Sequence, residues 1–165
     1  MQEPPIRADG LQLDEPRDFQ KCFWNIERLA WIVFALIIVL ALLGFTGAGG
    51  PFSRGHAEFT QGTLDYPRIA RWQRSEEFRI RLSPGEETRR VTFGSSFYEA
   101  FQIEGIAPEP ERQKSAAEGV EMSFAADADV EAFIVLYVKP QQLGLPSFTV
   151  GLNGDNQQFV STILP

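Results

Sequence analysis

The single histidine, His56, is the side chain best suited to acid–base or metal chemistry in this chain. As a general base it would need a nucleophile, and the candidates are Ser53, Ser95 and Ser96. They carry neither the surroundings of a nucleophile elbow nor a Ser-x-x-Lys pair. A zinc or copper site needs several His or Cys ligands, whereas the one cysteine, Cys22, lies on the far side of a long apolar stretch. We therefore predict a non-catalytic protein with no cofactor and no metal, in which His56 is exposed.

Three acidic residues alternate at Asp127, Asp129 and Glu131. Carboxylate clusters of this kind can bind calcium, but an EF-hand loop also needs a central glycine and a distal bidentate glutamate, which this run lacks. The run lies where a turn between two strands is expected. We interpret it as a solvated turn.

A third group combines arginine with aromatic rings in one stretch. The residues predicted to form an interface are Tyr66, Arg68, Arg71, Trp72 and Arg74. Arginine and aromatic side chains are enriched at the centres of protein interfaces, and arginine close to a membrane also attracts anionic headgroups. On an edge strand, arginine can instead serve only to discourage aggregation. The sequence leaves these three roles open.

The overall charge limits the partners of the chain. Its 165 residues carry a formal net charge of −7, whereas nucleic-acid binding needs a basic surface, so we expect no nucleic-acid partner. The charge is unevenly distributed. Residues 51–90 contain eight Arg against six acidic residues, a net of +2, and residues 91–165 contain three Lys or Arg against ten acidic residues, a net of −7. This asymmetry could orient a docking surface.

The longest apolar stretch, Leu29–Phe45, contains no charged residue. With residues 46–48 it has about twenty residues, enough for a helix to cross the roughly 30 Å hydrocarbon core of a bilayer. The glycines and proline of residues 47–51 are expected to end the helix. A cleavable signal peptide is the alternative, since residues 46–48 are small, but the apolar run is too long and the leader too acidic for one. We expect a retained anchor.

The chain up to the end of the apolar stretch divides into two parts. Residues 1–15 are polar and predict a disordered cytoplasmic tail, whereas residues 16–48 predict an amphipathic lead-in that continues into the membrane helix. Within that helix, Ala41, Gly44 and Ala48 recur at three- and four-residue steps. Small residues at this spacing let another helix pack closely, so they are the predicted helix-packing positions.

The flanking charges predict the orientation. Arg17, Lys21 and Arg28 precede the apolar stretch, while Arg54 follows it closely. By the positive-inside rule, the N-terminus lies in the cytoplasm and the large domain lies outside. In a bacterium this means a single-pass protein of the inner membrane whose C-terminal domain lies in the periplasm or on the outer face of the membrane.

Beyond a linker at residues 49–56, the sequence predicts a β domain over residues 57–165. Apolar and polar residues alternate over 78–82, 120–124 and 148–152, as in half-buried strands. Residues 132–138 are apolar on both faces, which predicts a central strand with Phe133 and Val135 in the core.

Roughly eight strands and no helix are expected in this domain, with a loop over residues 108–119. Pro67 lies inside a weaker strand candidate, 64–72, and predicts an edge or a bend there. The expected fold is all-β, an antiparallel two-sheet sandwich of the immunoglobulin-like kind, preceded by one transmembrane helix.

Several short motifs carry a resemblance to a known group of proteins. They are Gly50–Arg54, Leu64–Tyr66, Pro108–Glu111 and the closing segment Gly151–Pro165. The chain resembles a family of small uncharacterised bacterial single-pass membrane proteins, usually described as hypothetical. The resemblance implies an extracytoplasmic β domain and a membrane partner, because members are often encoded beside a multi-pass membrane protein. It supplies no catalytic residue.

These observations predict an accessory subunit without catalysis, anchored in the lipid bilayer and docked on a larger integral membrane protein complex. The alternative is an anchored module that binds a small ligand or an envelope polymer. Its cleft would be lined by exposed aromatic residues such as Phe97, Tyr98 and Phe101.

Overall fold

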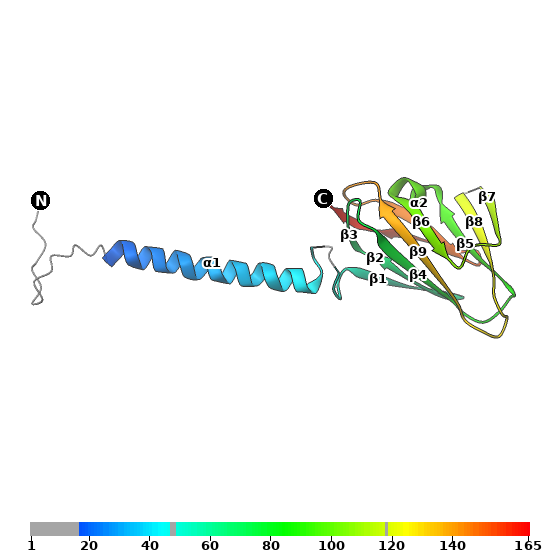
Figure 1. Cartoon of the computed structure of the whole chain (residues 1–165), viewed down its shortest axis with the longest axis horizontal. Coiled ribbons are helices and arrows are strands. Elements are labelled where there is room, and N and C mark those ends of the chain that lie inside the picture. The colour runs from blue at the N-terminus through cyan, green and yellow to red at the C-terminus, as the bar shows by residue number, and fades with distance from the viewer. Residues whose placement is uncertain (1–16, 47–48, 118) are drawn as a thin grey trace, which may run out of the picture. The chain divides into compact units, whose positions relative to one another are not determined.

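A computed structural model describes residues 17–46, 49–117 and 119–165 of the chain (Figure 1). They fall into two compact units, one that ends at Val39 and one that spans Leu40–Pro165. The tail predicted over residues 1–15 lies outside the described residues, as does the predicted helix-packing residue Ala48.

The N-terminal apolar stretch forms one helix, α1 (Arg17–Leu43). Among the described residues it is one candidate membrane-spanning helix, over Phe19–Leu43. Its uncharged part, Leu29–Leu43, is only about 22 Å long at 1.5 Å per residue, which is less than the thickness of a bilayer core. A span must therefore include the last turns of the lead-in, where the Arg28 guanidinium lies 4.3 Å from the ring centroid of Trp24.

The helix ends earlier than the sequence predicted. Gly44 adopts a left-handed backbone with φ of 95°, which glycine tolerates best. Its N–H donates to the carbonyl oxygen of Ala41, and the N–H of Phe45 donates to that of Leu40, each at 3.1 Å. This pair of hydrogen bonds closes a helix C-terminus. The predicted end at residues 47–51 is thus wrong, and Gly44 lies beyond the helix on which its packing role was predicted.

Two five-stranded antiparallel sheets make up most of the second unit (Figure 1). The first has the order β1 (Arg54–Phe59), β2 (Gly62–Pro67), β4 (Glu76–Leu82), β9 (Ala132–Pro140) and β6 (Phe101–Ala107). The second has the order β11 (Asp155–Val160), β10 (Ser147–Leu152), β5 (Thr88–Gly94), β8 (Gly119–Ala125) and β7 (Arg112–Ala116). A parallel pair, β12 (Thr162–Leu164) and β3 (Ile69–Arg71), and a short helix, α2 (Ser95–Ala100), complete the unit.

The inner faces of the two sheets share one hydrophobic core. Phe78 on β4 and Phe148 on β10 are fully buried, and their ring centroids lie 5.6 Å apart in an edge-to-face arrangement. Phe148 is central to the aromatic core, with further ring contacts at 5.2–6.0 Å to Phe101, Phe159, Phe97 and Tyr66.

The alternating segments predicted as strands are confirmed, since 78–82, 120–124 and 148–152 lie in β4, β8 and β10. Their apolar side chains face the core, for example Ile80 with an exposed fraction of 1%. The weaker candidate 64–72 breaks as predicted at Pro67, where β2 ends before β3 begins at Ile69.

Three local predictions are wrong. The central strand β9 is not buried on both faces, because Phe133 is 57% exposed and Val135 is only half-buried, while Ile134 and Leu136 face the core. The predicted loop 108–119 contains β7, whose exposed side chains leave no hydrophobic period to detect.

The third error concerns the region around α2, where no helix was expected. Phe97 of α2 and Phe101 of β6 are fully buried in the core, and Tyr98 is partly exposed. They do not form the exposed aromatic cleft on which the ligand-binding alternative relied.

Candidate interaction surfaces

The residues considered for catalysis are held in structural contacts. His56 Nδ1 lies 2.6 Å from Asp65 Oδ1 across the β1–β2 pair, and both side chains are exposed. The Ser53 hydroxyl donates to the carbonyl oxygen of Gly50 at 2.7 Å. No hydrogen bond joins His56 to any of the three candidate serines within the described part of the chain.

The acidic run forms a turn, as the sequence predicted. It lies between β8 and β9, and the Asp127 carboxylate accepts a hydrogen bond from the backbone N–H of Asp129 at 3.2 Å. The residues described here contain no group of three or more His, Cys, Asp or Glu side chains that could hold a metal ion.

The predicted interface residues on the two sides of Pro67 lie in different surroundings. Tyr66, just before it, packs on the core, with its ring centroid 5.0 Å from that of Phe159. Its ring lies over Gly55 on β1, so closely that any side chain there would collide with it. Tyr66 is thus a packing residue and not part of an exposed group.

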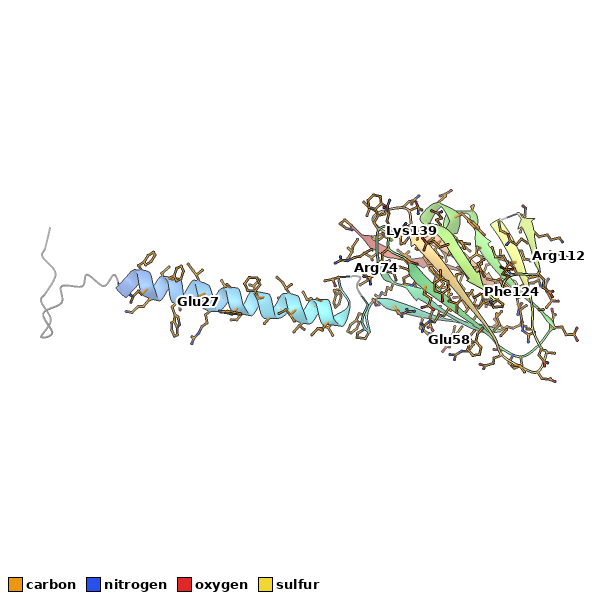
Figure 2. All side chains as sticks on the ribbon, in the orientation of Figure 1. Glu27, Glu58, Arg74, Arg112, Phe124 and Lys139 are labelled. Carbon is orange, nitrogen blue, oxygen red and sulfur yellow. The ribbon has the colours of Figure 1, made fainter. Side chains whose placement is uncertain are left out.

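Arg68, Arg71, Trp72 and Arg74 lie together at the end of the β domain that contains β3 and β12. The N–H of Arg68 donates to the Ser53 carbonyl oxygen at 2.8 Å, which fixes this segment to the start of β1. The N–H of Trp72 donates to the Leu164 carbonyl oxygen at 2.7 Å. Figure 2 shows Arg74 toward this end of the domain and Arg112 of β7 toward the other.

Apolar side chains lie beside Arg68. The rings of Phe45 and Phe52 stack with centroids 5.7 Å apart, and both are about half exposed. A cavity of about 540 Å³ opens here, and it is lined by Phe45, Phe52, Arg68, Ile69, Thr162 and Leu164.

A loop adds two more apolar side chains to this end. Leu143 and Leu145, 54% and 69% exposed, flank Gly144, whose N–H donates to the carbonyl oxygen of Ile163 in β12 at 3.0 Å. We define the basal surface as Phe45, Phe52, Arg68, Arg71, Trp72, Arg74, Leu143 and Leu145. The sequence did not predict its leucines, because only the Gly144–Ile163 pairing brings them there.

Two acidic residues adjoin the basal surface. Burial raises the pKa of the Glu76 carboxyl above its ordinary value, although the nearby Arg74 and Arg54 partly oppose this. The Glu77 carboxyl has a lowered pKa, because Arg79 Nη2 donates to it at 2.9 Å. Arg54 Nη2 lies 3.7 Å from the same Glu77 oxygen.

These opposite shifts predict opposite effects on stability. Charged Glu76 disfavours the folded state above its raised pKa, so Glu76→Gln should be more stable than the unmodified protein at neutral pH. The difference in the free energy of unfolding between the two proteins should shrink as the pH falls through that pKa toward 4.5, where the Glu76 carboxyl of the unfolded chain also takes up its proton. Urea unfolding of the full chain in detergent, at neutral pH and near pH 4.5, measures this difference.

Glu77→Gln is the matched control for that experiment. Charged Glu77 stabilises the fold above its ordinary pKa of 4.5, and this stabilisation is lost as the pH falls through the lowered folded-state value. Glu77→Gln should therefore lower stability at neutral pH. A loss of stability for Glu76→Gln at neutral pH would show that its burial is not the dominant influence.

Two loops at the opposite end of the domain carry acidic residues. Strand β4 runs about 20 Å from Glu76 beside the basal surface to Leu82, where the β4–β5 loop begins. This loop meets the β8–β9 turn through a hydrogen bond from the Gly85 N–H to the Ala128 carbonyl oxygen at 2.8 Å. The acidic residues of the two loops are Glu86, Glu87, Asp127, Asp129 and Glu131. Glu86 and Glu87 come from the segment with a net positive charge, so this acidic end does not simply follow from the uneven charge along the sequence.

A second exposed group lies on the outer face of the first sheet. Phe133 and Tyr137 of β9 are 57% and 46% exposed, with Val135 between them. In register beside them on β4 lie Arg81, opposite Phe133, and Arg79, opposite Val135. The Arg81 guanidinium lies 5.2 Å from the ring centroid of Phe133, a cation–π contact. We call Arg79, Arg81, Phe133, Val135 and Tyr137 the β9 patch.

Arg89 on β5 is a buried cation that the sequence did not predict. It is fully buried, and its Nη2 lies 3.5 Å from the Asp127 carbonyl oxygen. Its Nε and Nη1 have no hydrogen-bond partner among the described residues. The alternation of Val91 and Phe93 could have revealed its inward direction, because Arg89 is on the same face of the strand.

No known protein family and no curated protein sequence matches the chain.

Proposed function

We propose that this chain is a non-catalytic accessory subunit, anchored in a membrane by α1, whose β domain docks on a larger integral membrane protein. The observation that carries the proposal is the β9 patch. Aromatic and arginine side chains on one exposed sheet face have the composition of interface centres. Contiguous exposed apolar groups on a folded domain also favour an interaction site.

We further propose an immunoglobulin-like fold for the β domain. The order β2–β4–β9–β6 corresponds to the A–B–E–D sheet of that fold, and β5–β10–β11 corresponds to C–F–G. On this assignment β1 is an added edge strand, and β7 and β8 are a hairpin inserted between strands D and E. Such domains commonly serve as interaction modules, which agrees with an accessory role.

The proposed topology places the N-terminus in the cytoplasm and the β domain in the periplasm of a bacterial inner membrane. It rests on Arg17, Lys21 and Arg28 before the apolar stretch. Protease added outside spheroplasts should digest the β domain, which should otherwise remain membrane-bound. Protection of the domain until the membrane is lysed would mean that the orientation is reversed, and release of the intact domain would mean that α1 is removed as a signal peptide.

The docking proposal predicts a large effect from the β9 patch. The double variant Phe133→Ser/Tyr137→Ser should reduce the amount of a membrane protein that co-purifies with the tagged full chain in mild detergent by about tenfold or more. Both side chains are exposed, so the domain should stay folded.

Val160→Ser is the matched control, because Val160 is 51% exposed and lies on the edge strand β11 of the second sheet. It should leave recovery of the partner unchanged. Equal recovery with the double variant would refute docking through the β9 patch. A chain that purifies without any membrane protein would favour the ligand-binding alternative.

A further inference from the structure

We propose that the basal surface binds the anionic headgroups of phospholipids and so holds the β domain against the bilayer. This inference rests on the membrane anchoring by α1 proposed above. It adds a second site, distinct from the β9 patch, and assigns it a ligand class: the phosphate groups of a lipid surface.

The position of the basal surface is the first argument. The end of the apolar helix, Leu40–Leu43, belongs to the same compact unit as the β domain. The N–H of Phe52 donates to the Leu43 carbonyl oxygen at 3.1 Å, and Arg71 Nε donates to that of Thr46 at 2.9 Å. If α1 spans a bilayer, its end lies at the hydrocarbon boundary. The basal arginines then lie close enough to the headgroups for weakly screened attraction.

The chemistry of the side chains is the second argument. Within the described residues the guanidinium groups of Arg68, Arg71 and Arg74 form no salt bridge, although the Glu76 carboxyl lies near Arg74. Their planar donor arrays suit phosphate oxygens. Trp72, 44% exposed, and the neighbouring Phe and Leu side chains suit the boundary between headgroups and acyl chains. Arginine mixed with exposed apolar groups is the composition expected of a surface that rests on a membrane.

The distribution of charge is the third argument. The two distal loops carry five carboxylates, Glu86, Glu87, Asp127, Asp129 and Glu131. Although Arg90 Nη2 lies 3.7 Å from Glu86, the net negative charge of these loops is repelled by an anionic membrane. Attraction of the basal arginines and repulsion of the distal loops favour the same orientation of the domain. A protein partner at the basal surface would have to displace the lipids that this position already provides.

The fluorescence of Trp72 gives a direct test. Trp24→Phe and Trp31→Phe leave Trp72 as the only tryptophan in the full chain. The protein is reconstituted into nanodiscs of phosphatidylcholine, with or without phosphatidylglycerol, that contain a lipid with a nitroxide quencher on its headgroup. We expect strong quenching of Trp72 in the discs with phosphatidylglycerol, and a decrease on addition of salt.

Replacement of the arginines tests the proposed ligand contacts. Each basal arginine contributes about a fivefold preference for an anionic surface, so Arg68→Gln/Arg71→Gln/Arg74→Gln should lower the ratio of docked to free domain about a hundredfold. Arg90→Gln/Arg112→Gln/Lys114→Gln removes the same charge from the second sheet, away from the basal surface, and should leave quenching unchanged.

Two results would overturn the inference. One is unquenched Trp72 in discs that contain phosphatidylglycerol, and the other is equal quenching for the two triple variants. A photocrosslinker at position 72 that captures protein but no lipid in native membranes would likewise assign the surface to a protein partner. Co-elution of the chain with the discs reports insertion of α1 separately, so a failure of anchoring is distinguishable from a failure of headgroup binding.

Discussion

Replacing Phe148 by alanine should destabilise the β domain by about 3–5 kcal/mol. Its fully buried ring joins the two sheets through contacts with Phe78 on one sheet and Phe159 on the other. Removing the ring leaves a cavity at the centre of the aromatic core. Because domains of this size are commonly stable by only about 5–15 kcal/mol, the variant should lose a large share of its stability and unfold at a clearly lower urea concentration.

Urea unfolding of the full chain in detergent, monitored by near-ultraviolet circular dichroism, measures this loss of stability. Phe133→Ala is the matched control, since it removes an equal ring from an exposed position and should cost about 1 kcal/mol or less. Similar losses for the two variants would mean that Phe133 lies in the core, as the sequence alone had suggested.

Replacing Arg89 by methionine should leave the domain equally stable or stabilise it by about 1–4 kcal/mol. The guanidinium is fully buried, with one long contact to the Asp127 carbonyl oxygen. Its other two nitrogen atoms have no hydrogen-bond partner among the described residues. Methionine keeps much of the side-chain volume and removes the cost of burying a charge.

Arg90→Met is the control for that measurement, because Arg90 is the exposed neighbour of Arg89 on the same strand. Its Nη2 lies 3.7 Å from Glu86, a surface pair that contributes little, so the change should stay within about 0.5 kcal/mol. A loss of stability for Arg89→Met beyond that of Arg90→Met would show that the buried guanidinium is well paired in solution.

Much of the strand pattern could be predicted because alternation reports directly on burial. Phe78, Ile80 and Leu82 alternate with arginines, and this fixed both the strand and its inward face. Strand β9 gave no such information, because its outer face carries Phe133 and Tyr137 where polar residues are usual. Strand β7 was missed for the opposite reason, since it pairs with β8 through its backbone and buries none of its side chains.

The candidate surfaces were less predictable than the strands, because they depend on pairing between distant segments. The sequence grouped Tyr66 with Arg68, although the break at Pro67 puts Tyr66 on the core and Arg68 on the basal surface. Leu143 lies on that surface only because Gly144 pairs with Ile163. Likewise, nothing in the local sequence of β4 indicated that Arg81 lies beside Phe133, more than fifty residues away.

Site-specific photocrosslinking from position 133 in intact membranes tests the proposed accessory role most directly. Position 133 lies in the β9 patch, and position 160 lies on the exposed edge strand of the second sheet. Crosslinking from these two positions therefore compares two surfaces of the same folded protein. We expect a crosslink from position 133 to an integral membrane protein, and none from position 160. Equal crosslinking from both positions, or none from position 133, would contradict docking through the β9 patch.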